Sequence, residues 1–250
     1  ERTGYDLKLN GKDIDFGAAI AEQTGLGRIF SGTISPKLEV KGKGLAAGDF
    51  AISADGPAEM KFKSLSISTL DLLGPIGEAV NKTGKLPGAK LGAASSGGGL
   101  SLSGFTALTK FLGGRLRLDK PIDADTPLGK MNITGSAGMD AGMDFTSTIQ
   151  LTPATIAKLT GNKIKVKEAV PVPLKITGTW DKPKVSGIDV GKLVTALVAA
   201  AGKDALSGAV DDLLGGDKKG DNKKGDKKKG DKKKSTGDKA VDAAKGLLGK

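Results

Sequence analysis

The 250-residue chain contains no cysteine and no histidine. Their absence excludes a thiol nucleophile, an imidazole base, a disulfide and any metal site built on thiolate or imidazole ligands. Aromatic residues make up only 4% of the chain, so a compact core rich in large rings is not expected. The longest apolar run, LVTALVAAAG at 193–202, is about half the length of a membrane-spanning helix. The chain as given is therefore not expected to cross a bilayer.

The net charge of +11 is unevenly distributed, because residues 217–239 hold eleven lysines and five aspartates. The repeat GDKKGDNKKGDKKKGDKKK cannot bury enough apolar surface to fold, which predicts a disordered tail over 216–250. The final DKAVDAAKGLLGK fits a short amphipathic helix. Lysine blocks bind the phosphates of anionic lipid headgroups or of nucleic acid. The anionic-surface candidates are Lys227, Lys228, Lys229, Lys232, Lys233 and Lys234.

Two other interpretations of the tail stay open. A solubilising spacer is the simplest, and the aspartates that punctuate the repeat weaken its positive field. Nucleic acid is the less favoured partner, because the rest of the chain lacks a surface of aromatic and arginine side chains for stacking bases.

Apolar and polar residues alternate through many short segments, as expected of strands with one buried face. YDLKLN (5–10) places Tyr5, Leu7 and Leu9 on one face, and AEMKFKSLSIST (58–69) changes parity at Ser64, which predicts a bulge. Strands are also expected within 31–44, 113–125, 129–140, 142–152, 162–170 and 171–180.

Helical spacing is confined to a few segments, of which 13–27, 70–80 and 153–161 are short. The clearest helix is amphipathic and spans 189–214, with Asp189 as its cap. Residues 82–104 are rich in Gly and Ser and predict a flexible loop or linker, either between two subdomains or at the edge of one sheet. The expected organisation is a β segment over 1–81, the linker, a second β segment over 105–188, a helix over 189–215 and the tail.

Few residue patterns in the chain support catalysis. Asp123 and Asp125 flank one turn and Asp140 and Asp144 another, which fits solvated turn residues better than a pair of catalytic acids. The glycine-rich GLGRIFSG and SSGGGLSLSG lack the Lys-Ser/Thr of a phosphate-binding loop. We therefore expect no enzymatic activity, no metal ion and no cofactor.

The apolar faces of the predicted strands need more cover than the few helices can give. A sheet curled on itself would shield them and leave an apolar groove, where each buried CH₂ of an acyl chain would contribute roughly 0.8 kcal/mol. The predicted fold is thus mainly β, an elongated and curled antiparallel sheet with short helices and a C-terminal amphipathic helix. The groove candidates, taken from the second β segment, are Leu116, Leu118, Met131, Ile133, Phe145, Ile149, Val172, Leu174 and Ile176.

The order of these segments resembles the C-terminal region of the AsmA family. The resemblance covers residues 1–214 and rests on GLGRIFSGTISPKLEVKGKGL and LDLLG in the first half and on GGRLRLDKPIDADTPLGKMNITGSAGMDAGMDFTSTIQL in the second. Its most specific part is VPVPLKITGTWDKPKV (170–185), followed by Asp189 and the terminal helix.

The resemblance implies a non-enzymatic protein of the Gram-negative cell envelope. Such proteins lie in the periplasm, are anchored to the inner membrane by an N-terminal helix, here expected upstream of Glu1, and contribute to outer-membrane assembly or to phospholipid movement along a taco-shaped β groove. The expected partners are phospholipid or another acyl-chain lipid, a membrane surface, and envelope proteins reached through the 189–214 helix. The alternative is a structural or adhesive envelope protein whose core is filled and which binds no lipid.

Overall fold

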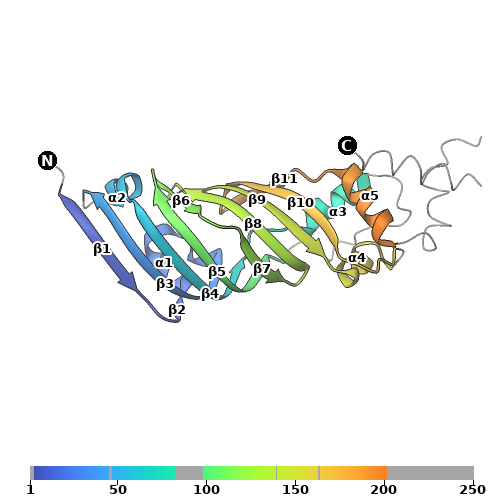
Figure 1. Cartoon of the computed structure of the whole chain (residues 1–250), viewed down its shortest axis with the longest axis horizontal. Helices are drawn as coiled ribbons and strands as arrows, with labels where there is room; N and C mark the ends of the chain where they lie inside the picture. The colour runs from blue at the N-terminus through green and yellow to red at the C-terminus, as the bar shows by residue number, and fades with distance from the viewer. Residues whose placement is uncertain (1–2, 45–46, 83–97, 139, 163, 202–250) are drawn as a thin grey trace, which may run out of the picture. The chain divides into compact units, whose positions relative to one another are not determined.

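The computed structural model describes residues 3–44, 47–82, 98–138, 140–162 and 164–201 (Figure 1). Its strands are β1 (Gly4–Asn10), β2 (Ile14–Asp15), β3 (Phe30–Lys43), β4 (Gly56–Ile67), β5 (Leu100–Leu112), β6 (Arg115–Leu118), β7 (Ile122–Thr126), β8 (Gly129–Gly138), β9 (Gly142–Leu151), β10 (Val170–Thr179) and β11 (Lys182–Ser186). Its helices are α1 (Phe16–Thr24), η1 (Leu26–Arg28), α2 (Ala47–Ser53), α3 (Leu73–Lys82), α4 (Pro153–Leu159) and α5 (Val190–Ala201).

The mainly β fold with an antiparallel sheet is confirmed, and all eleven strands belong to one sheet. The sheet order is β1-β3-β4-β5-β6-β8-β9-β10-β11. The short β2 continues the line of β1 along β3, and β7 continues the line of β6 between β5 and β8. β4 pairs directly with β5 along most of its length, so the strands before and after residues 83–97 form a single sheet. The sequence left open whether 82–104 separates two subdomains or lies at the edge of one sheet, and the structure has one sheet.

Local sequence signals explain where several elements begin and end. The side chain of Asp15 accepts a hydrogen bond from the backbone N–H of Ala18 at 3.0 Å and caps α1, which ends at Gly25 in the left-handed conformation. Asp189 caps α5 through Lys192 N–H at 3.0 Å. The predicted bulge is confirmed, because the pairing of β3 with β4 shifts register between Thr33 and Ile34 and skips Lys63, the neighbour of Ser64.

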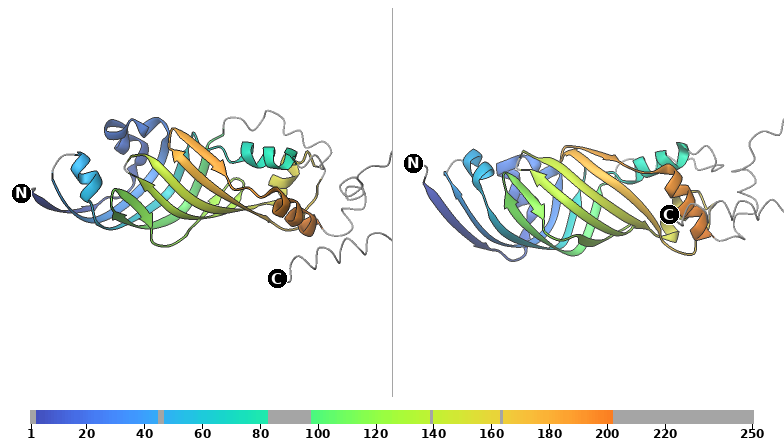
Figure 2. Two further views of the ribbon diagram at one scale, coloured as in Figure 1. Left: turned by 90° about the horizontal axis from the view of Figure 1, so that it is seen from above. Right: turned by 45° about the horizontal axis from the view of Figure 1, so that its top comes forward.

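The sheet is strongly curved, and helices lie on its concave side. Figure 2 shows α1 near one end of the curved sheet and α3 near the other, on the same side. At the second end α5 packs on β10 and on α3. There Leu193 and Leu197 are buried in the same apolar cluster as Val172 and Leu174, so this part of the concave face is covered by side chains.

Three expectations need correction. Residues 100–104, predicted to be linker, belong to β5, because Leu100 and Leu102 are buried against the core and the segment pairs with β4 despite its Gly and Ser content. The strand predicted over 162–170 is wrong before Val170: residues 164–169 form no strand, and the backbone N–H of Lys167 instead donates to the carbonyl of Ala200 on α5 at 3.0 Å. The face that carries Tyr5, Leu7 and Leu9 was expected to be buried. Leu7 and Leu9 are instead 41% and 43% exposed, because β1 is an edge strand.

Two sequence predictions reach beyond the described residues. The C-terminal helix is described only to Ala201, so its predicted continuation over 202–214 lies outside. The whole predicted tail, with its six candidate lysines, also lies outside.

A glycine in β8 allows that strand to lie close to β9. Gly135 has φ of 132° and is paired with Phe145. A Cβ atom at this position would collide with the carbonyl oxygen of Asp144, and L-residues rarely adopt this φ.

We predict that Gly135→Ala lowers the free energy of unfolding by roughly 1–3 kcal/mol, since the new methyl group meets backbone that cannot move aside easily. Urea denaturation measures the change. The control is Gly48→Ala in α2, where an added Cβ has no neighbour within 4 Å and should change stability by less than about 1 kcal/mol. Equal effects of the two substitutions would show that the close approach at Gly135 is unimportant.

Candidate functional site: an aromatic-lined apolar groove

The concave face of the sheet holds a partly open cavity of about 560 Å³, called the groove below. Side chains from strands β1 to β10, from α1 and from η1 line it. Its volume falls within the range of roughly 300–1,000 Å³ typical of small-molecule sites. The groove exists because the strands place every second residue on the concave face, while α1 covers only part of that face.

The few aromatic residues of the chain are concentrated in this groove. Six of the seven phenylalanines and the single tryptophan line it: Phe16, Phe30, Phe62, Phe105, Phe111, Phe145 and Trp180. Ring contacts link most of these, with centroids 4.7 Å apart for the stacked Phe62 and Phe105 and 5.8 Å apart for the edge-on Phe16 and Phe62. An apolar chain lying in the groove would therefore contact flat ring faces from α1 and from five regions of the sheet.

Trp180 closes the curl of the sheet. It follows β10, the second strand from one edge, and contacts Phe30 of β3, the second strand from the other edge, with ring centroids 4.8 Å apart. Its carbonyl oxygen accepts a hydrogen bond of 2.6 Å from the hydroxyl of Thr69, which lies after β4. On its own side of the sheet Trp180 also contacts Phe145, at 6.1 Å. These contacts bring distant strands together across the concave face.

The groove lining carries no charged side chain. Apart from the indole N–H of Trp180, its one polar side-chain group is the hydroxyl of Thr109, which is buried and donates to the carbonyl of Ala58 at 3.0 Å. A charged headgroup would find no oppositely charged partner among these residues, so a ligand in the groove would be bound through its apolar part.

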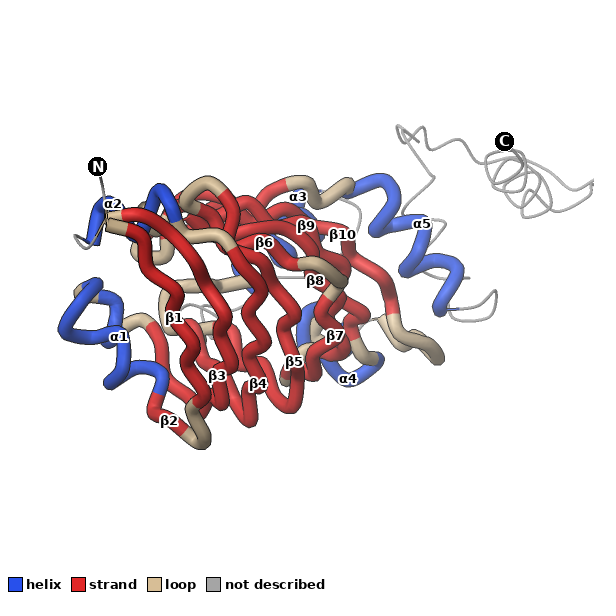
Figure 3. Tube along the Cα trace, turned by 60° about the vertical axis from the view of Figure 1, so that its left-hand side comes forward, coloured by secondary structure: helices blue, strands red, loops and turns tan. Residues whose placement is uncertain are grey.

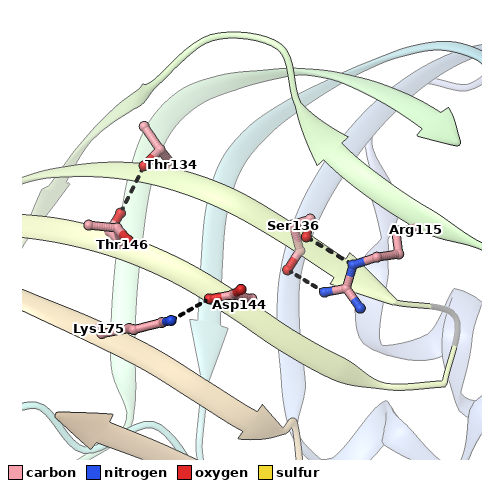
Figure 4. A network of polar contacts seen from close by, with 6 residues as sticks. All are labelled: Arg115, Thr134, Ser136, Asp144, Thr146 and Lys175. Atoms are coloured by element: carbon pink, nitrogen blue, oxygen red, sulfur yellow. Dashed lines mark hydrogen bonds and ion pairs between the residues drawn. The ribbon is translucent and has the colours of Figure 1, made fainter.

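The opposite face of the sheet is polar. There Arg115 donates to the hydroxyl of Ser136 at 3.0 Å, and the Lys175 ammonium lies 3.2 Å from Asp144 (Figure 4). Similar exposed ion pairs join Lys61 to Glu59 and Lys110 to Asp55. Exposed pairs of this kind contribute about 0–1 kcal/mol each, so they keep this face hydrated more than they hold the sheet together.

The carboxyl groups with shifted pKa values do not line the groove. A hydrogen bond from Lys63 lowers the pKa of Asp13, and a hydrogen bond from the Thr179 hydroxyl lowers the pKa of Asp181. Both groups are exposed at the surface and stay ionised at neutral pH. Of the carboxylates predicted to flank turns, only Asp140 does so, accepting from Gly142 N–H at 2.9 Å. Asp123 and Asp125 lie within β7 and Asp144 lies within β9, so the turn prediction is wrong for these three, and Asp123 accepts from the side-chain amide of Asn132 across the strand pair at 2.7 Å.

The structure brings six of the nine predicted groove residues to the groove: Leu116, Leu118, Met131, Ile133, Phe145 and Ile176. The other three, Ile149, Val172 and Leu174, share the same face but do not line the groove. They are at most 2% exposed and lie in the part of the core that also contains Leu193 and Leu197 of α5. The alternation identified the correct face, and the helices determine which part of it is filled.

The prediction from sequence missed the whole contribution of the first half of the chain. Phe16, Phe30, Phe62 and Phe105, with aliphatic neighbours on the same strands, form much of the lining. The alternation in 31–44 and 58–69 was a signal that could have found Phe62 and the aliphatic lining residues of β3 and β4, but Phe16, Phe30 and Phe105 lie outside these segments. The first half was left out of the predicted groove because the sequence did not show that both halves form one sheet.

Comparison of this chain with protein-family models, with curated proteins and with solved structures gives no match. None of the helices in the described ranges is long and apolar enough to span a bilayer. Acidic side chains within those ranges form no cluster of three or more that could hold a metal ion.

We predict that Phe30 and Trp180 stabilise the fold cooperatively. In a double-mutant cycle with Phe30→Leu and Trp180→Leu, the coupling free energy should be about 0.5–1.5 kcal/mol, as found for aromatic pairs in contact. Urea unfolding of the four proteins measures it. Trp180→Leu combined with Leu193→Ala in α5 is the control and should be additive, because Leu193 belongs to the helix-covered part of the core. Additivity in the first cycle would show that this ring contact does not hold the curl.

Proposed function

We propose that this protein is a non-enzymatic envelope protein that binds the acyl chains of phospholipid, or of another acyl-chain lipid, in its groove. The observation that carries the proposal is the continuous apolar lining with its cluster of aromatic rings. At roughly 0.8 kcal/mol for each buried CH₂, a chain of ten methylenes would gain about 8 kcal/mol before the cost of ordering it. The uncharged lining supports recognition of the chain rather than of the headgroup.

The resemblance to the AsmA family supports the cellular part of the proposal. The role is then maintenance or assembly of the outer membrane, by binding or conducting phospholipid in the periplasm of a Gram-negative bacterium. An inner-membrane anchor and envelope protein partners reached through α5 belong to the same proposal.

We predict that the purified chain binds palmitate with one molecule per groove and that Phe145→Asp weakens binding at least tenfold. Phe145 is only half-buried, so an aspartate there can be hydrated and the fold should persist, while the groove gains a charge. Native mass spectrometry with added palmitate, and with lipid retained from a bacterial envelope, measures occupancy. A change in Trp180 fluorescence on adding palmitate is an independent measure of binding to the unsubstituted protein, because Trp180 lines the groove and is the only tryptophan.

The matched control is Thr146→Asp, the next residue on β9, which is exposed on the opposite face. It should leave palmitate binding unchanged. A stable protein that binds neither palmitate nor co-purified phospholipid would refute the proposal and favour the structural alternative, in which the groove has no lipid ligand.

The lysine-rich tail carries a second part of the proposal, contact with anionic headgroups. We predict that replacing Lys227–Lys229 and Lys232–Lys234 by glutamine weakens sedimentation of the protein with phosphatidylglycerol vesicles, because each lysine near such a surface contributes roughly 1 kcal/mol. Binding by the unsubstituted chain should fall as salt is raised. If the glutamine variant binds the vesicles equally well, the tail is a spacer.

A further inference from the structure

Among the described strands, β1 forms an edge of the sheet. It pairs with β3 on one side, and no described strand pairs with its other side (Figure 3). The strand is regular over seven residues and contains neither proline nor a bulge. The opposite edge strand, β11, carries Pro183 between Lys182 and Lys184, which is a common protection against strand addition. The edge at β1 lacks this protection.

The backbone groups at the open edge can be assigned. Thr3 accepts from Gly44 N–H at 2.8 Å, and Gly11 donates to the carbonyl of Pro36 at 2.9 Å, so the odd-numbered residues direct their backbone groups toward β3. Because these groups alternate along an antiparallel strand, Gly4, Asp6, Lys8 and Asn10 direct their N–H and C=O groups outward. The backbone groups of these four alternate residues can form a regular ladder of hydrogen bonds with another strand.

The side chains of β1 are complementary to a second β1 in antiparallel orientation. If Leu7 of two copies lie opposite each other, Asp6 of each copy faces Lys8 of the other, and Gly4 faces Asn10. Shifting the pairing by one step in either direction would place Asp6 opposite Asp6 or Lys8 opposite Lys8. Only the register centred on Leu7 therefore pairs opposite charges.

Charges on β3 extend this pattern. Asp6 already lies 3.5 Å from the Lys41 ammonium, and Lys8 is paired in register with Glu39. In the two-copy arrangement one row across the interface would read Lys41, Asp6, the second copy's Lys8 and the second copy's Glu39. Signs alternate along the whole row, which favours this pairing over any with like charges adjacent.

We propose that β1 is a docking edge for β1 of a second copy of this chain, giving a two-fold dimer with one continuous sheet. Leu7 and Leu9, which are about two-fifths exposed in the single chain, would then be covered on the groove side of the joined sheet. Because Leu9 lines the groove, the grooves of the two copies would meet at the two-fold axis. The docking follows from the edge itself, and only the joined groove rests on the proposed lipid binding.

The first experiment measures the mass of the protein in solution and tests whether opposite charges on the two β1 strands are needed for dimerisation. The full chain of 25.3 kDa should sediment as a dimer, and Asp6→Lys and Lys8→Asp should each weaken dimerisation at least tenfold. Mixing the two variants should restore a dimer, because each lysine pair of one variant then faces the aspartate pair of the other. Lys8→Pro should give a folded monomer whose melting temperature no longer depends on protein concentration, since the N–H of Lys8 is not used within the single sheet.

The second experiment measures the register. The chain has no cysteine, so Leu7→Cys introduces a single thiol. At the two-fold axis the two Cα atoms would be about 4.5 Å apart, within reach of a disulfide. Leu9→Cys is the matched control: it lies on the same face with similar exposure, but its two copies would be about 13 Å apart and should not cross-link.

A chain that sediments as a monomer at all concentrations, with Leu7→Cys uncross-linked under oxidation, overturns the proposal and leaves the edge to a strand of another protein. Equal cross-linking of Leu7→Cys and Leu9→Cys would also overturn it, because the register would be wrong. Neither readout depends on lipid, so failure of palmitate binding would leave the dimer intact, and a monomer that binds palmitate would leave the proposed function intact.

Discussion

The contact of Trp180 with Phe30 is the constraint on which the rest of the structure depends. The sheet has one apolar face and too few helices to cover it. By joining a segment after β10 to the start of β3, with the Thr69 hydrogen bond beside it, Trp180 turns that face inward. A flat sheet of the same sequence would expose an apolar surface far larger than soluble proteins tolerate. The curl is therefore the way this chain buries apolar area without a second layer.

The curl alone does not decide whether the enclosed space is filled. At one end, α5 adds Leu193 and Leu197 to the core around β10, where Ile149, Val172 and Leu174 are buried. At the other end α1 supplies the smaller Ala19 and Ile20 with Phe16, and the groove remains. Charged side chains are absent from the lining of the groove. The groove is thus the region where the sheet has more apolar surface than the helices can cover, and this property makes an apolar ligand a reasonable occupant.

The two long edges of the sheet differ in the same physical terms. β11 carries a proline and two lysines, whereas β1 presents a regular row of backbone donors and acceptors beside leucines that are part of the groove side. An edge of this kind is incomplete in both hydrogen bonding and apolar cover. A strand that supplies both would extend the sheet and the groove together, so assembly and ligand binding would share one structural element.

The sequence by itself determined most of the strands and their faces and the presence of α1, α3, α4 and α5, though not of α2, because period-two alternation, caps and the parity change at Ser64 are local signals. It did not determine that Leu100–Gly104 is strand, that 164–169 is not, or that Ile149, Val172 and Leu174 are covered while Phe62 and Phe105 line a groove. Alternation shows which side chains share a face, but not what lies against that face. Only the tertiary structure decided this, since the pairing of β4 with β5, the closure at Trp180 and the position of α5 are contacts between residues far apart in the chain.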